Sequence, residues 1–155
     1  MIEGFILMAL AIEVCNLTKR YDTTVALDRI SFEVQAGEIM GFLGPNGAGK
    51  TTTLRILTGL LAPTEGSVRL NGLDGERQSL QIRRTVGYLP ENVSLYPELR
   101  VQEYLAYRAK IKGVARQQRR GRLEEVIQRC ALGEVRRKLI GRLSKGYRQR
   151  VALAD

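Results

Sequence analysis

The sequence lacks histidine and tryptophan entirely, and it has only two cysteines and four prolines among its 155 residues. Without histidine, the chain offers no imidazole for metal ligation or for acid–base catalysis near neutral pH. Cys15 and Cys130 stand far apart, which gives neither zinc-site nor redox spacing, and free thiols fit a reducing cytosol. These absences exclude histidine-based sites and a disulfide scaffold.

Long apolar runs are missing too. The run at residues 5–12 is much shorter than the ~20 residues needed to cross a bilayer. Glu3 stands where a signal peptide carries positive charge. Met8 is an equally good start, so residues 1–11 are expected to be an N-terminal extension. We expect a cytoplasmic chain that reaches the inner face of the cell membrane only through a partner.

Acids are scarce in one part of the chain. Between Arg108 and Arg150 there are 15 lysines and arginines against three acids, a net charge of +12, which leaves −3 of the overall +9 for the rest. Such a block binds nucleic acid or an anionic membrane, or is a solvated helical face close to nucleotide phosphates and a partner. No interleaved aromatics suggest base stacking, although Tyr104 and Tyr107 lie just upstream. Direct nucleic-acid binding is therefore not expected.

Residues 44–51 fit the pattern G-x-x-x-x-G-K-[ST] of the phosphate-binding P-loop. Glycines let such a loop curl so that its N–H groups turn inward around phosphate oxygens. The lysine reaches the β- and γ-phosphates, and the hydroxyl after it ligates Mg²⁺. The predicted ATP-binding residues of the loop are Gly44, Pro45, Asn46, Gly47, Ala48, Gly49, Lys50, Thr51 and Thr52.

The surroundings of the loop fit that role. Residues 39–43 are predicted to form a buried strand that enters the loop. Residues 51–58 are predicted to form a helix that leaves it, with the positive helix N-terminus under the phosphates.

Apolar periodicity predicts the remaining elements. Strands are expected at residues 12–17, 30–34, 67–70 and 86–89, with turns at Tyr21-Asp22 and Asn71-Gly72. Helices are expected at residues 78–84, 101–112, 116–130 and 135–138, with Gly113 separating the second from the third. Val101, Tyr104, Leu105, Arg108 and Ile111 share one helical face, and Leu123, Val126, Ile127 and Cys130 share another.

A second anion-binding helix start is predicted near residue 144. Ser144 is placed to cap a helix that begins near Tyr147, with Gly146 close by. A serine and a glycine before a helix are commonly just a cap. Here they follow Lys50 by 94 residues, beyond a helical insertion.

This order of motifs resembles the ATP-binding subunit of ABC transporters, from about residue 12 to the end. In that family, the P-loop of one subunit and the signature loop of the opposing subunit enclose one ATP. The family signature is Leu-Ser-Gly-Gly-Gln, and the variant here, Leu-Ser-Lys-Gly-Tyr, is similar to that of exporter subunits. The resemblance implies contacts to ATP across a homo- or heterodimer from Ser144, Lys145, Gly146 and Tyr147.

The resemblance assigns two more residues. Tyr21 matches the aromatic residue that stacks on adenine, although a tyrosine covering strand ends would look the same. Glu91 stands where the family has a glutamine that contacts Mg²⁺ and the attacking water, although it is also a plausible plain loop carboxylate. The metal contacts implied are thus Thr51 and Glu91. Tyr96, Leu99 and Tyr104 are candidates for contact with an integral-membrane permease, or for core.

The implied fold is α/β, a P-loop NTPase core with an antiparallel β layer and an inserted helical subdomain. We expect the core and β layer at residues 12–98, the helical subdomain at 99–142, and the signature with the start of its helix at 143–155. The family's Walker B Asp and Glu, switch histidine and dimer-loop Asp are not found. Residues 151–155 imitate a Walker B strand, but they continue the helix after the signature.

The chain is therefore expected to be the front part of an ABC ATPase, from a frameshifted gene, a split reading frame or a partial sequence. Alone, it is expected to be poorly stable and to hydrolyse ATP negligibly. The leading interpretation is an ATP-binding subunit that couples ATP to transport through a permease, with export favoured. The alternatives are a non-transport ABC ATPase acting on ribosomes or DNA, and a non-hydrolysing nucleotide-binding fragment.

Overall fold

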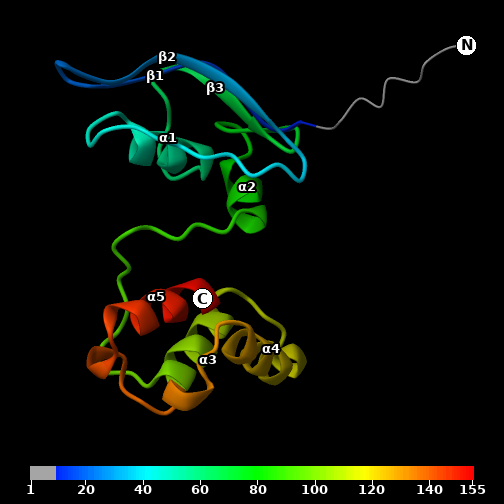
Figure 1. Ribbon diagram of the computed structural model, residues 1–155. Coiled ribbons are helices and arrows are strands. Elements are labelled where there is room, and N and C mark those ends of the chain that lie inside the picture. Colours follow the sequence, from blue (N-terminus) through cyan, green and yellow to red (C-terminus); the bar gives the residue numbers. More distant parts are fainter. Residues whose placement is uncertain (1–9) are drawn as a thin grey trace, which may run out of the picture. The chain divides into compact units, whose positions relative to one another are not determined.

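The structure, a computed structural model, describes residues 10–155 in two compact units, one up to Tyr88 and one from Leu89 to Asp155 (Figure 1). The alternative start at Met8 and most of the expected extension lie outside the described residues. Each unit has its own core and is described by itself.

The first unit is built on an antiparallel sheet in the strand order β2–β1–β3–β4. The long strands β1 (Leu10–Tyr21) and β2 (Thr24–Gln35) are joined by a tight turn in which Asp22 has a φ of 46°. On its other side β1 pairs with β3 (Glu65–Leu70), which continues through a two-residue turn into β4 (Leu73–Asp74). The predicted antiparallel layer and its turns are confirmed.

Two helices, α1 (Lys50–Leu57) and α2 (Ser79–Thr85), lie against one face of this sheet (Figure 1). Both helices were predicted within one residue of these bounds. Their apolar sides and the sheet share one core of buried side chains: Val14, Leu17, Leu27, Ile56, Leu57, Val68, Leu70 and Ile82.

Two predicted buried strands, residues 39–43 and 86–89, are not strands in the structure. Ile39 and Leu43 are 98% and 94% exposed. An apolar run of this kind becomes a central strand only when neighbouring strands supply hydrogen bonds and cover both faces. Within residues 10–155 the four named strands pair only with one another, so these two predictions were wrong for the described chain.

The second unit is helical. Its main helices are α3 (Val101–Ile111), α4 (Arg116–Arg129) and α5 (Lys145–Ala154), and two 3₁₀ turns, η1 (Gly133–Val135) and η2 (Ile140–Arg142), connect α4 to α5. They share a second core of buried side chains: Val101, Tyr104, Leu105, Ile127, Leu132, Val135, Ile140, Leu143, Val151 and Ala154. Among the residues that the structure describes, no helix is long and apolar enough to cross a membrane.

Two details of the helical prediction were wrong. Ile111 was placed on the apolar face of α3 but is 57% exposed, and Arg108, one turn earlier, pairs with Asp155. The predicted helix at residues 135–138 is absent: Val135 ends the 3₁₀ turn η1, and the three residues after it form a turn and a bend. Gly113 separates α3 from α4 as expected, with a φ of 74°.

The close approach of β3 to β1 gives a test of the fold. A Cβ on Gly66 would lie 2.5 Å from the carbonyl oxygen of Cys15, whereas one on Gly72 would meet nothing within 4 Å. Both glycines have positive φ, so each alanine substitution costs about 1–2 kcal/mol in backbone strain. We expect Gly66→Ala to lower the free energy of unfolding by more than about 3 kcal/mol, because the paired strands must also separate. Urea unfolding measures both, and equal losses would contradict the described pairing.

Candidate functional site

The glycine-rich loop has a backbone that side chains would not permit. Gly47 and Gly49 have φ values of 86° and 84°, and Gly49 occupies the N-cap of α1. A Cβ on Gly49 would clash with the side chain of Leu27 and would lie 2.6 Å from the carbonyl oxygen of Ala26. The same addition at Gly47 would meet nothing within 4 Å. Conformation alone therefore favours glycine at position 47, whereas conformation and lack of space both favour it at position 49.

Helix α1 begins directly after this loop with an N-terminus suited to an anion. It has no side-chain cap and no acid in its first turn. The first N–H groups of a helix lack intrahelical acceptors, and the aligned peptide dipoles add partial positive charge there. This is the arrangement in which helix starts bind phosphate.

The side chains at the start of α1 either form hydrogen bonds to the loop, as those of Lys50 and Thr53 do, or face solvent, as that of Thr51 does. The Lys50 Nζ donates to the carbonyl oxygens of Gly44 and Pro45 at 2.6 and 2.7 Å, so its ammonium lies over the loop. Thr53 is buried, and its hydroxyl donates to the carbonyl of Gly49 at 3.0 Å. Thr51 is exposed instead, which leaves its hydroxyl on the solvent side of the helix.

Tyr21, the last residue of β1, presents an exposed aromatic ring in the same unit as the loop. The ring is 44% exposed, and the Lys19 ammonium lies 5.3 Å from its centre. An exposed ring at the end of a rigid hairpin is available for stacking. The Tyr21 ring is therefore accessible, as the predicted stacking on adenine requires.

In the second unit, Ser144 caps α5 as predicted, because its hydroxyl accepts a hydrogen bond from the Tyr147 N–H at 3.3 Å. Lys145 and Gly146 are exposed at the helix start, which has no acid in its first turn. Tyr147 packs partly against the helical core, and the Arg150 guanidinium lies 5.3 Å from its ring centre. The first turn of α5 therefore offers one hydroxyl, one ammonium and free N–H groups to solvent.

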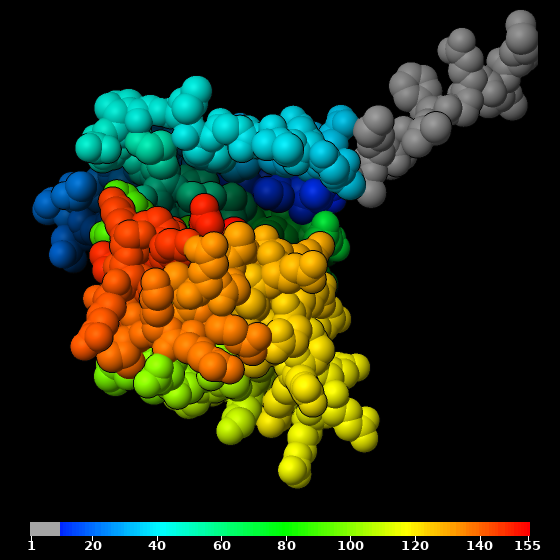
Figure 2. Space-filling view, turned by 60° about the horizontal axis from the view of Figure 1, so that its bottom comes forward, coloured from blue at the N-terminus to red at the C-terminus, as the bar shows by residue number. Residues whose placement is uncertain are grey.

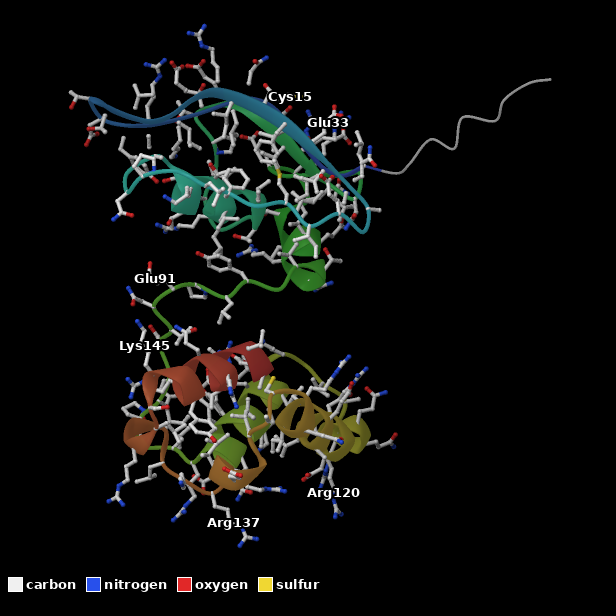
Figure 3. All side chains as sticks on the ribbon, viewed as in Figure 1. Cys15, Glu33, Glu91, Arg120, Arg137 and Lys145 are labelled. Carbon is white, nitrogen blue, oxygen red and sulfur yellow. The ribbon has the colours of Figure 1, made fainter. Side chains whose placement is uncertain are left out.

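Glu91 lies beside this helix start. The side-chain amide of Gln149 donates to the Glu91 backbone carbonyl at 2.9 Å, which holds the loop against α5. Figure 3 shows Glu91 and Lys145 on neighbouring segments, and both line a small hollow of about 190 Å³. Sequence reasoning missed Gln149, whose only signal is its position one turn into the predicted helix.

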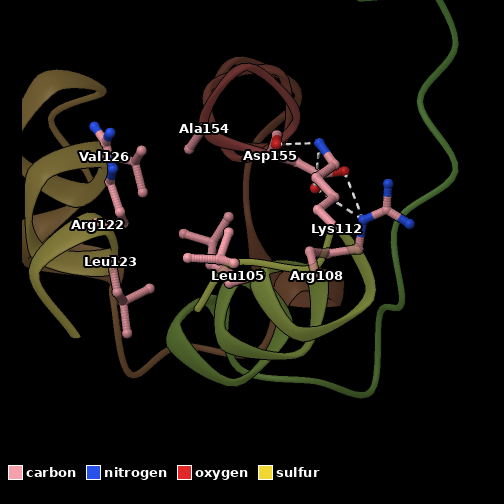
Figure 4. A pocket seen from close by; sticks show the side chains of 10 residues that line it. Leu105, Arg108, Lys112, Arg122, Leu123, Val126, Ala154 and Asp155 are labelled. Atoms are coloured by element: carbon pink, nitrogen blue, oxygen red, sulfur yellow. Dashed lines mark hydrogen bonds and ion pairs between the residues drawn. The ribbon is translucent and has the colours of Figure 1, made fainter. Parts of the chain in front are cut away.

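Asp155, which imitates the end of a Walker B strand in the sequence, follows helix α5 and has a structural role. Its carboxylate accepts from Arg108 Nε at 2.8 Å and from the Tyr104 hydroxyl at 3.1 Å, beside an apolar pocket (Figure 4). Burial favours the neutral acid, but Arg108 and Lys112 more than offset it and lower the pKa of Asp155. Burial and the Asp155 charge raise the pKa of Tyr104 to about 12.

Within residues 10–155 no group of three or more acidic, histidine or cysteine side chains comes together. Thr51 and Glu91 lie in separate units, so the structure describes each predicted magnesium contact by itself.

Comparison with known proteins is consistent with this geometry. A protein-family model described as ABC transporter matches residues 27–155. The bacitracin transport ATP-binding protein BcrA of Bacillus licheniformis is 36% identical over 95% of this chain and 47% of its own length. The SkfA peptide export ATP-binding protein SkfE of Bacillus subtilis is 37% identical over 92% of this chain and 59% of its own. A probable sulfate/thiosulfate import ATP-binding protein CysA of Chlorella vulgaris is 37% identical over 95% and 61%.

Solved structures are similar as well. An ATP-binding subunit of an ABC transporter has a TM-score of 0.78 and 30% identity, over 93% of this chain and 60% of that one. The cbiO1 protein of Clostridium perfringens, part of the cbiONQ transporter complex, has a TM-score of 0.80 and 27% identity, over 94% and 60%. The chain spans about half to three fifths of the length of these relatives.

The Asp155 ion pair predicts a pH dependence of stability. Because its pKa is lowered in the folded state, the carboxylate stabilises the fold fully above its ordinary value of 3.8 and loses this contribution as the pH falls through the folded-state pKa. We expect Asp155→Asn to be less stable than the unmodified protein at neutral pH, and the difference to shrink below pH ~4. Urea unfolding over a pH series measures it.

Asp28→Asn is the control, because Asp28 pairs with Arg29 on the surface, where such pairs contribute little. A difference between Asp155→Asn and the unmodified protein that stays constant with pH would contradict the ion-pair interpretation.

Proposed function

Because this chain belongs to the ABC transporter family, as its ATP-binding domain, we propose that it binds Mg–ATP as part of a subunit that couples ATP binding and hydrolysis to transport through a membrane permease. The observation that carries the proposal is the geometry of residues 44–51. Three positive-φ glycines, a lysine folded over the loop and an uncapped helix start together form a phosphate cradle.

In this proposal the cradle works by exchange of hydrogen-bond partners. The Lys50 ammonium releases the carbonyl oxygens of Gly44 and Pro45 and donates to the β- and γ-phosphates instead. The N–H groups at the start of α1 then bind phosphate oxygens that the lysine cannot reach. The N–H groups are already fixed by the helix, so only Lys50 has to change its hydrogen-bond partners when the nucleotide enters.

The hydroxyls at the start of α1 fit the metal that accompanies ATP. Thr51 is exposed at the first turn of α1 and would hold Mg²⁺, with Thr52 beside it on the phosphates. When bound, Mg²⁺ neutralises phosphate charge. Glu91 is proposed as a second metal or water contact, because its backbone is held against α5 by Gln149. Tyr21 is proposed to stack on the adenine ring.

A second copy, or a related subunit, would supply the other side of the ATP. The first turn of α5 carries Ser144, Lys145 and Gly146 at an N-terminus without acids, which fits a γ-phosphate. Lys145 replaces a glycine of the family signature and would add a positive charge to this contact. A head-to-tail dimer is therefore proposed, in which each copy offers its P-loop and its α5 to different nucleotides.

The direction of transport is proposed as export. Two of the relatives are named for bacitracin transport and for peptide export, but a relative of the same identity is named for sulfate import, so identity alone does not decide. The Leu-Ser-Lys-Gly-Tyr signature at residues 143–147 supports export in this proposal, because it is similar to that of exporter subunits. The transported substrate is set by the permease.

Removal of the loop lysine tests the proposal. We expect Lys50→Ala to weaken Mg–ATP binding at least about tenfold, because a charge-assisted contact to phosphate is lost. Titration with a fluorescent ATP analogue measures the dissociation constant. Lys110→Ala, which removes an exposed lysine from α3, is the matched control and should change little. Equal affinities of both variants and the unmodified protein would overturn the proposal.

The adenine contact has its own test. We expect Tyr21→Ala to weaken ATP binding by about 1–3 kcal/mol and to leave the affinity for inorganic tripolyphosphate unchanged, because tripolyphosphate has no base to stack. Tyr21→Phe keeps the ring and should bind ATP normally. Calorimetric titration measures both ligands. If Tyr21→Ala weakened both ligands alike, the residue would act on the phosphates or the fold and not on the base.

A further inference from the structure

A cationic hollow lies in the second unit, between the start of α3 and the segment that precedes α5. It holds about 640 Å³ and is lined by Arg100, Arg137, Lys138, Leu139 and Arg142. This volume falls within the ~300–1,000 Å³ that ligand sites occupy in proteins. Four of the five lining residues are cations and none is an acid.

Paired backbone holds these residues in place. Arg100 and Leu139 form an antiparallel bridge, and the Val101 N–H donates to the Lys138 carbonyl at 3.1 Å. Behind this bridge, Val101 and Ile140 are 0% and 1% exposed. The segment from η1 to η2, orange in Figure 2, lies on the surface of the unit. The hollow is therefore built on a fixed frame backed by the helical core.

The cations of the hollow differ from their neighbours in how they are neutralised. Arg136, the residue before them, pairs with Glu124 at 2.9 Å. Within residues 10–155, no carboxylate lies within 4.0 Å of three of the lining cations: Arg137, Lys138 and Arg142.

Arg100 is the lining cation with an acid nearby. Its Nε lies 3.8 Å from Glu103, and its guanidinium donates to the Arg137 carbonyl at 2.5 Å. This hydrogen bond fixes one wall of the hollow. The other three positive charges face an open space without compensation.

We propose that this hollow binds a phosphate-bearing anion, either a lipid headgroup at a membrane surface or a free phosphate compound. The guanidinium groups of Arg137 and Arg142 present parallel donors that match phosphate oxygens, and Lys138 adds a compact charge. In Figure 3 the Arg137 side chain points outward from its unit. No aromatic side chain lines the hollow, so nucleic-acid bases would have no surface on which to stack. The proposal does not depend on nucleotide binding at residues 44–51.

The test uses the full chain with Lys50→Ala, which weakens phosphate binding at the loop. Two probes separate the sources: sedimentation with vesicles of phosphatidylglycerol and phosphatidylcholine, against phosphatidylcholine alone, and calorimetric titration with inorganic pyrophosphate. Binding to one probe or both identifies the source, and it supports the proposal when it depends on the cations of the hollow, as the variants below determine. Binding to neither overturns it.

Two matched triple variants then locate the site. Arg137→Gln, Lys138→Gln and Arg142→Gln together should weaken binding at least about tenfold. Lys110→Gln, Arg116→Gln and Arg120→Gln remove the same charge from α3 and α4 and should weaken it less than about threefold. Equal weakening would mean diffuse attraction and would overturn the proposal. The proposal would also be overturned if a single-stranded oligonucleotide bound more tightly than either probe and if the first triple variant abolished that binding.

All six positions are exposed, so the unfolding midpoints should remain unchanged.

A measurement on the chain without substitutions in the hollow adds a check that does not depend on folding of the variants. If the Lys50→Ala chain binds anionic vesicles, pyrophosphate should release it more completely than sodium chloride at the same ionic strength, which only screens the charges. Equal release by both salts would overturn a specific phosphate site.

Discussion

The contact between Gly49 and β2 is the constraint on which the phosphate cradle depends. The start of α1 lies directly against β2, so a side chain at position 49 would overlap Leu27 and the Ala26 carbonyl. The loop before it has a positive φ at Gly47 as well. The close contact with β2 thus holds the α1 N-terminus, and with it the place where phosphate would bind, against the sheet.

The helical unit also holds a loop against a helix, through other residues. Ser144 caps α5, while Gln149 one turn later donates to the backbone carbonyl of Glu91. The loop that carries Glu91 is therefore held by the same helix whose first turn is proposed to contact a second nucleotide. Both groups thus belong to one unit and are linked through α5 by this hydrogen bond.

Local chemistry predicted the features that depend on neighbouring residues in the chain. The β1–β2 turn, the α1 start and the Ser144 cap each need only a few consecutive residues. Residues 39–43 were mistaken for a strand because an apolar run cannot reveal whether neighbouring strands are present. Gln149 and Glu91 stand 58 residues apart, so their contact leaves no sequence signal.

The sequence does not predict which of the charged side chains form ion pairs. The basic block between Arg108 and Arg150 looks uniform in the sequence, yet the fold divides it. Some of its arginines pair with Glu124 and Glu125, and Arg108 pairs with Asp155. Others collect without an acid around one hollow, because two segments distant in the sequence pair their backbones there. Which cations lie without an acid therefore depends on the fold, which brings these segments together.

The central claim is that residues 44–52 form the phosphate cradle. Its most direct test is the backbone amide spectrum of the isotopically labelled chain, recorded by nuclear magnetic resonance as Mg–ATP is added. The account predicts that the largest shifts fall on the N–H groups from Gly47 to Thr52, with smaller shifts near Tyr21. Unchanged amides at the loop, with the largest shifts elsewhere in the chain, would contradict it.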